Sequence, residues 1–261
     1  MTQERLTGGN MNEVTREGDS VFRTAGPWTP TVHRLLRHLH EQGLAWVPEP
    51  RGMSPDGCEI VGFIEGIVPS YPMPSWVWAE SVLVDTARKL RALHDATVGY
   101  VDPNASWQLT THQPEEVICH NDFAPYNMVF EDGECIGAID FDMVSPGPRL
   151  WDLAYLAYRV VPLTDPANPD VPGFDEETVR ARLARLIDAY GVPCSAIEVL
   201  EMTIARLEDL ARFSDHMAEE RRNPELRDHA ELYRRDAVWV RKMIRHESTI
   251  HRESGEGICD S

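Results

Sequence analysis

The feature that most constrains the fold is a short stretch of strand-like sequence within an otherwise helical region. Residues 117–119, 128–130 and 135–139 are three apolar runs of strand length. The last two runs are separated by Glu-Asp-Gly-Glu, and Asp-Gly between short apolar runs is a strong signal for a β-hairpin. The sequence therefore predicts a hairpin over 128–139, with polar residues gathered at its ends.

The regions on either side of this hairpin have different patterns. Residues 1–66 contain turn signals and strand-like segments at 20–23 and 59–63, with one helical repeat that begins near Pro30. We expect this part to form a small β-rich lobe. Residues 67–250 are expected to form a larger, mainly helical lobe that carries the hairpin, and residues 251–261 a flexible tail. The helices of the larger lobe are expected near 75–96, 150–160, 176–190, 195–220 and 225–247.

Composition excludes some classes of function. The formal net charge of −18 argues against a general nucleic-acid binder, because such proteins hold phosphates with clustered Lys and Arg. No apolar run approaches the length of a membrane span, and no opening segment reads as a signal peptide. The five cysteines form no CxxC pair. We therefore expect a cytoplasmic protein that binds neither nucleic acid nor membrane.

Polar residues follow the strands at the positions where a phosphate-transferring site needs them. Phosphoryl transfer requires Mg²⁺ to neutralise phosphate charge and a carboxylate that takes the proton of the attacking hydroxyl. Mg²⁺ prefers oxygen ligands, usually one or two of them from protein carboxylates. A hairpin can fold such groups back toward each other although they are distant in sequence. The candidate residues are His120, Asp122, Asn127, Asp140 and Asp142.

The segments His-Asn-Asp-Phe-Ala-Pro-Tyr-Asn at 120–127, Ile-Asp-Phe-Asp at 139–142 and Pro-Arg-Leu-Trp-Asp-Leu-Ala at 148–154 resemble the aminoglycoside-phosphotransferase and choline-kinase-like superfamily. The resemblance is close over residues 117–154 and general elsewhere. It implies an α+β, bilobal, protein-kinase-like fold with a small β-rich N-lobe and a larger helical C-lobe. It also implies ATP or GTP as co-substrate and Mg²⁺ as cofactor.

The resemblance assigns a role to each matched residue. It implies that Asp122 is the catalytic base and that Asn127 and Asp140 are the magnesium ligands. His120 and Asp152 would be structural supports of the catalytic loop. Asp142 lies where the family often has glycine, and two alternatives stay open for it: an approach to the metal, or a position facing solvent.

The N-lobe departs from the family pattern. The family usually has a lysine on the third strand, which holds nucleotide phosphates and pairs with a helix glutamate, but this chain has no lysine before Lys89. The matching strand position is Arg23, and the helix offers Val32 or His33 in place of an acid. Arg23 is therefore either a phosphate-binding residue or an ordinary exposed strand arginine. Its planar guanidinium is not equivalent to a lysine ammonium.

Other nucleotide contacts are expected from Gly8 and Gly9, as a short phosphate-covering loop, and from Phe63 and Glu65 at the lobe boundary, where the backbone would meet the adenine ring. An ordinary strand end is the alternative for the last two. The acceptor is expected to be a hydroxyl-bearing small molecule, with an aminoglycoside-like antibiotic as one candidate. Carboxylates that would suit a cationic acceptor lie along one predicted helix: Asp209, Asp215, Glu219 and Glu220.

Two other classes of protein stay open. The missing lysine and the short glycine pair also fit a catalytically weak or inactive kinase-like protein that binds nucleotide or acts in immunity. A metal-dependent hydrolase would instead use His120, Asp122, Asp140 and Asp142 as ligands of a transition metal. The sequence does not distinguish ATP from GTP, and it leaves the acceptor and the oligomeric state open.

Overall fold

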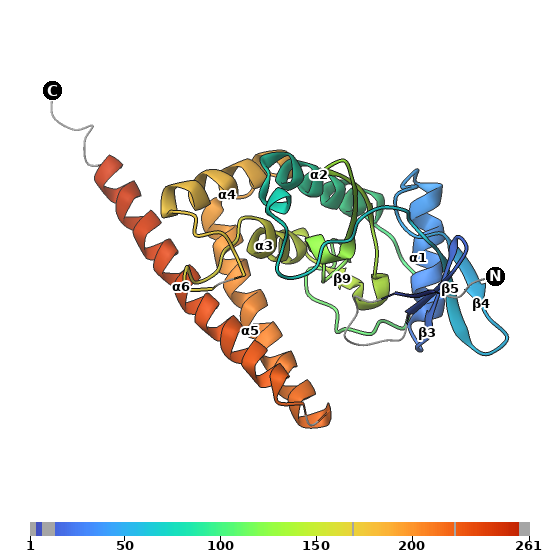
Figure 1. Ribbon diagram of the computed structural model, residues 1–261. Coiled ribbons are helices and arrows are strands. Elements are labelled where there is room, and N and C mark those ends of the chain that lie inside the picture. Colours follow the sequence, from blue (N-terminus) through green and yellow to red (C-terminus); the bar gives the residue numbers. More distant parts are fainter. Residues whose placement is uncertain (1–3, 7–13, 169, 222, 256–261) are drawn as a thin grey trace. The chain divides into compact units, whose positions relative to one another are not determined.

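The structure is a computed structural model that describes residues 4–6, 14–168, 170–221 and 223–255, with side chains described up to residue 245. The chain divides into two compact units, Met1–Asp152 and Leu153–Ser261 (Figure 1). The first unit therefore contains the hairpin as well as the β-rich part, and the lobe boundary predicted near residue 66 stays a prediction. Gly8 and Gly9 lie outside the described residues.

The first unit begins with a five-stranded antiparallel sheet of order β1-β2-β3-β5-β4, with helix α1 beside it (Figure 1). The apolar residues of α1 at 32, 35, 36 and 39 are all buried, as their helical spacing predicts. The strands expected at 20–23 and 59–63 and the helix expected to begin near Pro30 are confirmed. The bounds are β1 Glu4–Leu6, β2 Val14–Glu17, β3 Ser20–Thr24, β4 Pro50–Met53, β5 Cys58–Gly62 and α1 Thr29–Glu41.

The predicted hairpin is present as β7 (Met128–Glu131) and β8 (Glu134–Ala138), which pair antiparallel. Its turn residues Asp132 and Gly133 both have positive φ, 49° and 83°, which is the geometry that makes Asp-Gly favourable there. A backbone pair between Ile67 and Phe130 joins β7 to the segment that follows the sheet, with both N···O distances 2.8 Å.

Two elements around the hairpin differ from expectation. The helix predicted over 75–96 is interrupted, because Ala79 has extended dihedrals between the short helix η1 (Ser75–Trp78) and α2 (Glu80–Ala96). A strand that the sequence did not predict, β9 (Ser145–Gly147), pairs antiparallel with β6 (Val117–Cys119). Two single-turn helices complete the unit: η2 Pro125–Asn127 and η3 Phe141–Met143.

The second unit is helical, as predicted. In it α5 and α6 lie side by side along much of their length (Figure 1). Helix α6 continues to Gly255, so residues 251–255 of the expected tail are helical. None of the helices among the described residues has the length and apolar character needed to cross a lipid bilayer. The bounds are α3 Arg149–Val160, which begins in the first unit, α4 Glu176–Tyr190, α5 Ala196–Arg221 and α6 Glu225–Gly255.

Candidate active site

Asp152, at the start of α3, fixes the loop that follows β6. Its side chain is fully buried and accepts hydrogen bonds from the backbone N–H of His120 (2.6 Å) and of Asn121 (2.8 Å). The ring Nε2 of His94 lies 3.2 Å from the same carboxylate. Burial acts to raise the pKa of Asp152, but the His94 contact and the His120 N–H outweigh it, so the pKa lies below its usual value. Asp152 therefore holds the loop after β6 through two of its backbone N–H groups.

Asn121 is a second anchor of this loop, and the sequence analysis missed it. The residue is buried with φ of 65°, a left-handed conformation that Asn tolerates better than most residues. Its side-chain nitrogen donates to the backbone oxygen of Met143 (2.8 Å) and to Ser145 Oγ (2.9 Å), while Trp151 Nε1 donates to its oxygen (3.0 Å). The loop is thus joined to β9 and α3. The signal in the sequence was Asn between two polar motif residues directly after a strand.

His120 is fully buried. Its Nε2 lies 3.0 Å from the backbone oxygen of Ile139, and because a carbonyl oxygen only accepts, Nε2 carries the hydrogen. The ring also packs against Phe123 and Phe141, at centroid distances of 5.5 and 4.7 Å. His120 therefore ties the loop after β6 to the residue that follows β8.

Asp122 and Asn127 are held together by direct hydrogen bonds. Asn127 Nδ2 donates to Asp122 Oδ2 (2.8 Å) and to the Asp122 backbone oxygen (3.0 Å). Tyr126 donates its hydroxyl to the other carboxylate oxygen, Oδ1, at 2.6 Å. The Asp122 side chain is partly exposed, so its orientation is fixed while it stays accessible to a ligand. A positioned, accessible carboxylate of this kind can accept a proton.

Asp140 follows β8 in a left-handed conformation, with φ 64° and ψ 63°. The N–H of the preceding residue, Ile139, donates to the backbone oxygen of Asn127 at 2.8 Å, which brings the two predicted metal ligands onto adjoining backbone segments. Within the described part of the chain, Asn127 Oδ1 and Asp140 Oδ2 accept no hydrogen bond. One amide oxygen and one carboxylate oxygen are the kind of donor that Mg²⁺ takes from proteins, so these residues fit the ion.

Arg23, on β3, is not an exposed strand arginine. Its side chain is only 11% exposed, and its guanidinium contacts three carboxylates. Nε lies 2.5 Å from Glu59 Oε2, Nη1 3.1 Å from Asp140 Oδ1 and Nη2 2.8 Å from Asp142 Oδ1. Burial acts to lower the pKa of Arg23, but the charges of Asp142, Glu59 and Asp140 more than offset it, so the pKa is raised. Arg23 is cationic at every accessible pH.

Glu59 is the acidic partner that the sequence analysis missed. It lies on β5 directly opposite Arg23 in the strand register, and its side chain has no exposed area. His33 Nε2, from α1, lies 2.8 Å from the second carboxylate oxygen of Glu59. Burial acts to raise the pKa of Glu59, but the His33 hydrogen bond and the Arg23 charge lower it overall. The signal in the sequence was one acidic residue within an otherwise apolar strand.

Asp142 is buried, so the alternative in which it faces solvent is wrong. Its side chain is 9% exposed and pairs with Arg23. Burial raises the pKa of Asp142 to about 6; Arg23 opposes this effect, while Asp140 and Glu59 add to it. The structure therefore places Asp142 with the arginine.

Phe63 and Glu65 form a separate cluster just after β5. The guanidinium of Arg16 lies 3.6 Å from the centre of the Phe63 ring and 2.8 Å from Glu65, whose side chain is 80% exposed. The Phe63 N–H donates to the backbone oxygen of Asp19 at 2.8 Å. No hydrogen bond or ion pair among the described residues joins this cluster to the Asp122 group.

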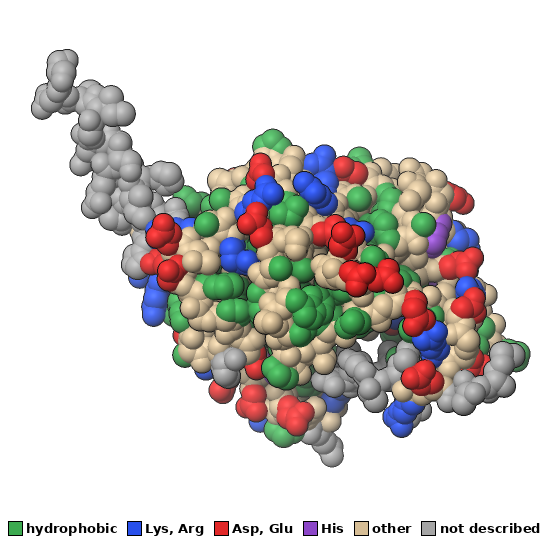
Figure 2. All heavy atoms as spheres, turned by 45° about the horizontal axis from the view of Figure 1, so that its top comes forward, with side chains coloured by type: hydrophobic (Ala, Val, Ile, Leu, Met, Phe, Trp, Pro, Cys, Tyr) green, Lys and Arg blue, Asp and Glu red, His purple; other side chains and the backbone are tan. Residues whose placement is uncertain are grey.

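The four acidic residues predicted for a cationic acceptor do not converge. Asp209 pairs with two arginines of its own helix, and Asp215 pairs with Arg234 of α6. Glu219 and Glu220 are exposed. On the face shown in Figure 2, acidic side chains lie singly or in small groups, often beside arginines or lysines. A solvated helix face accounts for these carboxylates.

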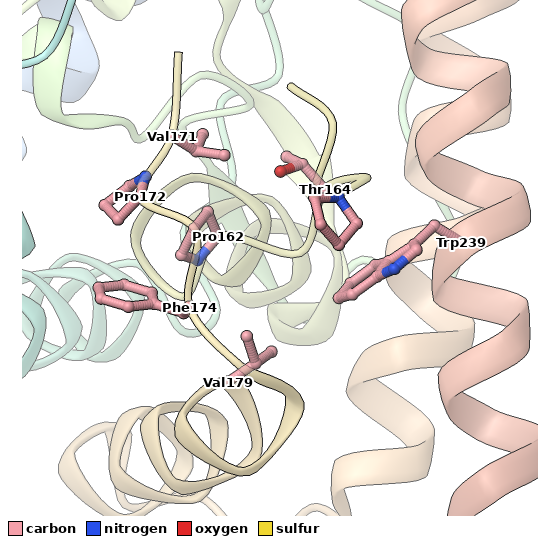
Figure 3. A pocket seen from close by; sticks show the side chains of 8 residues that line it. Pro162, Thr164, Val171, Pro172, Phe174, Val179 and Trp239 are labelled. Atoms are coloured by element: carbon pink, nitrogen blue, oxygen red, sulfur yellow. The ribbon is translucent and has the colours of Figure 1, made fainter. Parts of the chain in front are cut away.

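A small cavity in the second unit has mostly apolar walls and includes none of these four acids. It has a volume of about 10 Å³ and is lined by residues that include Thr164, Phe174 and Trp239 (Figure 3). A neighbouring cavity of about 300 Å³ shares Phe174 and Trp239 and adds Lys242 at its wall.

The hydrolase alternative lacks the cluster that it needs. Among the described residues, the group of three His, Cys or acidic side chains whose ligand atoms lie within 4.8 Å of one another is His94, Cys119 and Asp152. All three are buried, and the Asp152 carboxylate is already engaged by backbone N–H groups. The four ligands predicted for a hydrolase do not form such a group.

An antiparallel sheet with one helix, a helical unit, and a hairpin that follows the loop after β6 define a mixed α+β, protein-kinase-like fold. The chain belongs to the phosphotransferase enzyme family, whose family model matches residues 102–194. The fold class predicted from the sequence is confirmed.

Known relatives fall into two groups. The chain is 36% identical to the trifolitoxin immunity protein of Rhizobium leguminosarum bv. trifolii over 195 residues. The aligned residues cover 72% of this chain and 73% of that protein. Among solved structures it resembles a choline/ethanolamine kinase family protein from Mesorhizobium loti, with TM-score 0.61, 18% identity and 93% of each chain covered. It also resembles the streptomycin–ATP ternary complex of APH(2")-IIa, with TM-score 0.56, 16% identity and 89% and 93% covered.

Proposed function

We propose that this protein is a Mg²⁺-dependent phosphotransferase that moves the γ-phosphate of ATP or GTP to a hydroxyl of a small molecule. The observation that carries the proposal is the joined set of Asp122, Asn127 and Asp140. A carboxylate held by two hydrogen bonds lies beside an amide oxygen and a carboxylate oxygen that are both unengaged in the described part of the chain. Membership of the phosphotransferase family supports the same reaction.

In this proposal Asp122 is the catalytic base. Its carboxylate accepts the proton of the acceptor hydroxyl as the oxygen attacks the γ-phosphorus, and the bond to the nucleoside diphosphate breaks. Asn127 and Tyr126 each hold one carboxylate oxygen, which fixes the direction from which the proton arrives. The partial exposure of Asp122 leaves the approach open to an acceptor.

Asn127 and Asp140 would hold the magnesium ion. When bound, the ion neutralises phosphate charge and fixes the geometry of the transferred group. Arg23 would contact phosphate oxygens with the nitrogens that now face Asp140 and Asp142. A nucleotide role for Phe63, Glu65, Gly8 and Gly9 stays part of the proposal. The solved complex of APH(2")-IIa with streptomycin and ATP supports a nucleoside triphosphate as the phosphate donor.

The acceptor class is proposed only as a hydroxyl-bearing small molecule, in the cytoplasm, where nucleoside triphosphates are available. An aminoglycoside-like antibiotic is one candidate, supported by the streptomycin complex of a relative of the same fold. The scattered acids of α5 give no cluster for a polycation. A panel of amino alcohols, sugars and antibiotics therefore tests the acceptor without prejudging it.

A second candidate function follows from the trifolitoxin immunity protein, the 36% identical relative. In this alternative the chain protects its cell from a toxic compound by binding it, with weak or no phosphate transfer. The two candidates differ in whether Asp122 is needed. A variant that keeps protection without transferring phosphate would favour the binding role.

The test is a phosphate-transfer screen with Mg²⁺ and either nucleotide against that panel, followed by Asp122→Ala with any acceptor that reacts. We expect Asp122→Ala to lower turnover by at least about 10³-fold, because general-base catalysis and acceptor orientation are both lost, while nucleotide binding is kept. Asp132→Asn is a matched control, because it removes one negative charge from the exposed turn of the hairpin. Equal turnover of Asp122→Ala and wild type would refute the assignment.

A further inference from the structure

The acidic partner of the phosphate-binding side chain comes from a different element than in the family pattern. The pattern pairs a strand lysine with a helix glutamate, whereas here a strand arginine, Arg23, pairs with a strand glutamate, Glu59. The helix contributes His33, which contacts the glutamate and not the arginine. The three side chains thus form a continuous chain from α1 through β5 to β3.

We propose that Glu59 positions Arg23 for the nucleotide phosphates and weakens its hold on the metal ligand Asp140, and that His33 couples this pair to helix α1. The inference rests on the proposed function, because it assumes a Mg²⁺–nucleotide complex in the site. It adds two positioning residues, Glu59 and His33, that touch neither nucleotide nor acceptor.

The geometry of the guanidinium separates the two tasks of Arg23. Its Nε–H points to Glu59, while Nη1 and Nη2 point to Asp140 and Asp142. A planar fork held at Nε can still present its two terminal nitrogens to a pair of phosphate oxygens. Because Glu59 is opposite Arg23 in the strand register and has no exposed area, this hold is set by the sheet itself.

Glu59 also limits the competition between Arg23 and the metal. Arg23 Nη1 contacts Asp140 Oδ1, one of the two oxygens of the predicted metal ligand. Without the negative charge of Glu59, the Arg23 guanidinium would keep two of its three carboxylate contacts, Asp140 and Asp142. The guanidinium would then be drawn closer to Asp140 and Asp142, because Glu59 would no longer attract it toward β5. Magnesium would then have to displace a more tightly held arginine from Asp140, so a higher Mg²⁺ concentration would be required.

His33 fixes the other oxygen of Glu59. Its side chain is 5% exposed, and its Nε2 lies 2.8 Å from Oε1, so the carboxylate is held on both sides. His33 lies in the second turn of α1, which begins at Thr29. A glutamine at this position keeps a donor on a more flexible side chain, and we expect it to weaken the coupling without removing it.

The experiment uses the full chain and thermal unfolding as the readout, with Mg²⁺ titrated at a fixed, near-saturating concentration of ADP. We expect Glu59→Gln to raise the Mg²⁺ concentration at half-maximal stabilisation by about tenfold, the effect of one charge-assisted hydrogen bond, and His33→Gln by a smaller factor. Arg51→Gln is the control, because Arg51 pairs with Glu49 and Asp19 on the same sheet but contacts none of the site residues.

A merely structural role for Glu59 would lower the unfolding temperature without nucleotide and leave the Mg²⁺ midpoint unchanged, and that result would overturn the inference. If Glu59→Gln fails to fold, as judged by circular dichroism, His33→Gln and Glu59→Asp carry the same test. The triple variant Arg23→Lys, His33→Glu, Glu59→Gln restores the family arrangement and should return the midpoint toward wild type; a midpoint no better than that of Glu59→Gln would count against the inference.

The outcomes separate this inference from the proposed function. Wild-type protein that binds Mg²⁺–ADP but transfers no phosphate from ATP to any acceptor would contradict the proposed function alone. A midpoint that is identical in wild type and Glu59→Gln, with transfer intact, would contradict the inference alone. Wild-type protein that shows no nucleotide-dependent stabilisation would contradict both.

Discussion

Asp152→Asn should destabilise the protein strongly although the two side chains have nearly the same shape. The carboxylate is fully buried and accepts from the backbone N–H groups of His120 and Asn121, with His94 Nε2 at 3.2 Å. The amide keeps one acceptor oxygen and places an NH₂ group where the other oxygen was. At least one N–H of the catalytic loop then faces another donor.

The size of the effect follows from these contacts. A buried donor left without an acceptor costs about 1–3 kcal/mol, and the remaining contacts lose the part of their strength that came from the negative charge. We therefore expect a loss of about 3–5 kcal/mol in the free energy of unfolding, the range for breaking a buried charge pair. Asp95→Asn is the matched control: Asp95 pairs with Arg91 and Arg149 but is 47% exposed, so less than about 1 kcal/mol is expected.

Urea unfolding followed by circular dichroism measures both variants against wild type. Because the folded pKa of Asp152 is lowered, its ionisation stabilises the protein above the unfolded-state pKa of about 3.9, and this stability is lost as pH falls through the folded value. The difference between wild type and Asp152→Asn should thus be full near neutral pH and shrink below about pH 4. If the free energy of unfolding fell by less than about 1 kcal/mol near neutral pH, Asp152 would not be an important anchor of the loop after β6.

Two further predictions test the site and the backbone around it. Tyr126→Phe removes the hydroxyl that holds Asp122 Oδ1, so we expect turnover to fall by about tenfold with unfolding nearly unchanged; turnover equal to or above wild type would show that Tyr126 does not orient the carboxylate. Gly66→Ala should cost clearly more stability than Gly133→Ala, measured by urea unfolding. Both glycines have positive φ, but a Cβ at Gly66 would lie 2.5 Å from a Val129 methyl carbon, whereas Gly133 has open space; equal losses would contradict the predicted clash.

The hairpin and the residues that it presents were predictable because their signals are local. Asp132 and Gly133 adopt the left-handed turn that their side chains favour, and the apolar runs on either side pair as expected. Strand β9 was not predictable in the same way, because Ser145-Pro146-Gly147 reads as a turn by composition. Its pairing with β6 is decided by tertiary contacts, including the Asn121 side chain that reaches Ser145.

The partner of Arg23 could not be read from the sequence for a different reason. Arg23 and Glu59 are 36 positions apart and meet only because β3 and β5 are neighbours in a particular register. A shift by one residue would turn Glu59 to the other face of the sheet. The sequence did indicate His33 on the helix, but a rule taken from the family looked for an acid there, and the acid lies on the strand.

The arrangement around Asp140 favours a catalytic reading over a purely structural one. A buried arginine is stabilised by one well-placed carboxylate, yet Arg23 contacts three, and two of them belong to the segment after β8. Three carboxylates around one cation leave excess negative charge, and burial, with smaller contributions from Asp140 and Glu59, raises the pKa of Asp142 to about 6. Such an excess destabilises the protein by itself and would be relieved by a bound divalent cation. A protein that only binds a toxic compound would gain no advantage from this cluster of carboxylates, unless that compound were itself strongly cationic. A Mg²⁺ requirement for nucleotide binding would therefore support the phosphotransferase proposal before any acceptor is known, and the need for Asp122 then separates it from a binding role.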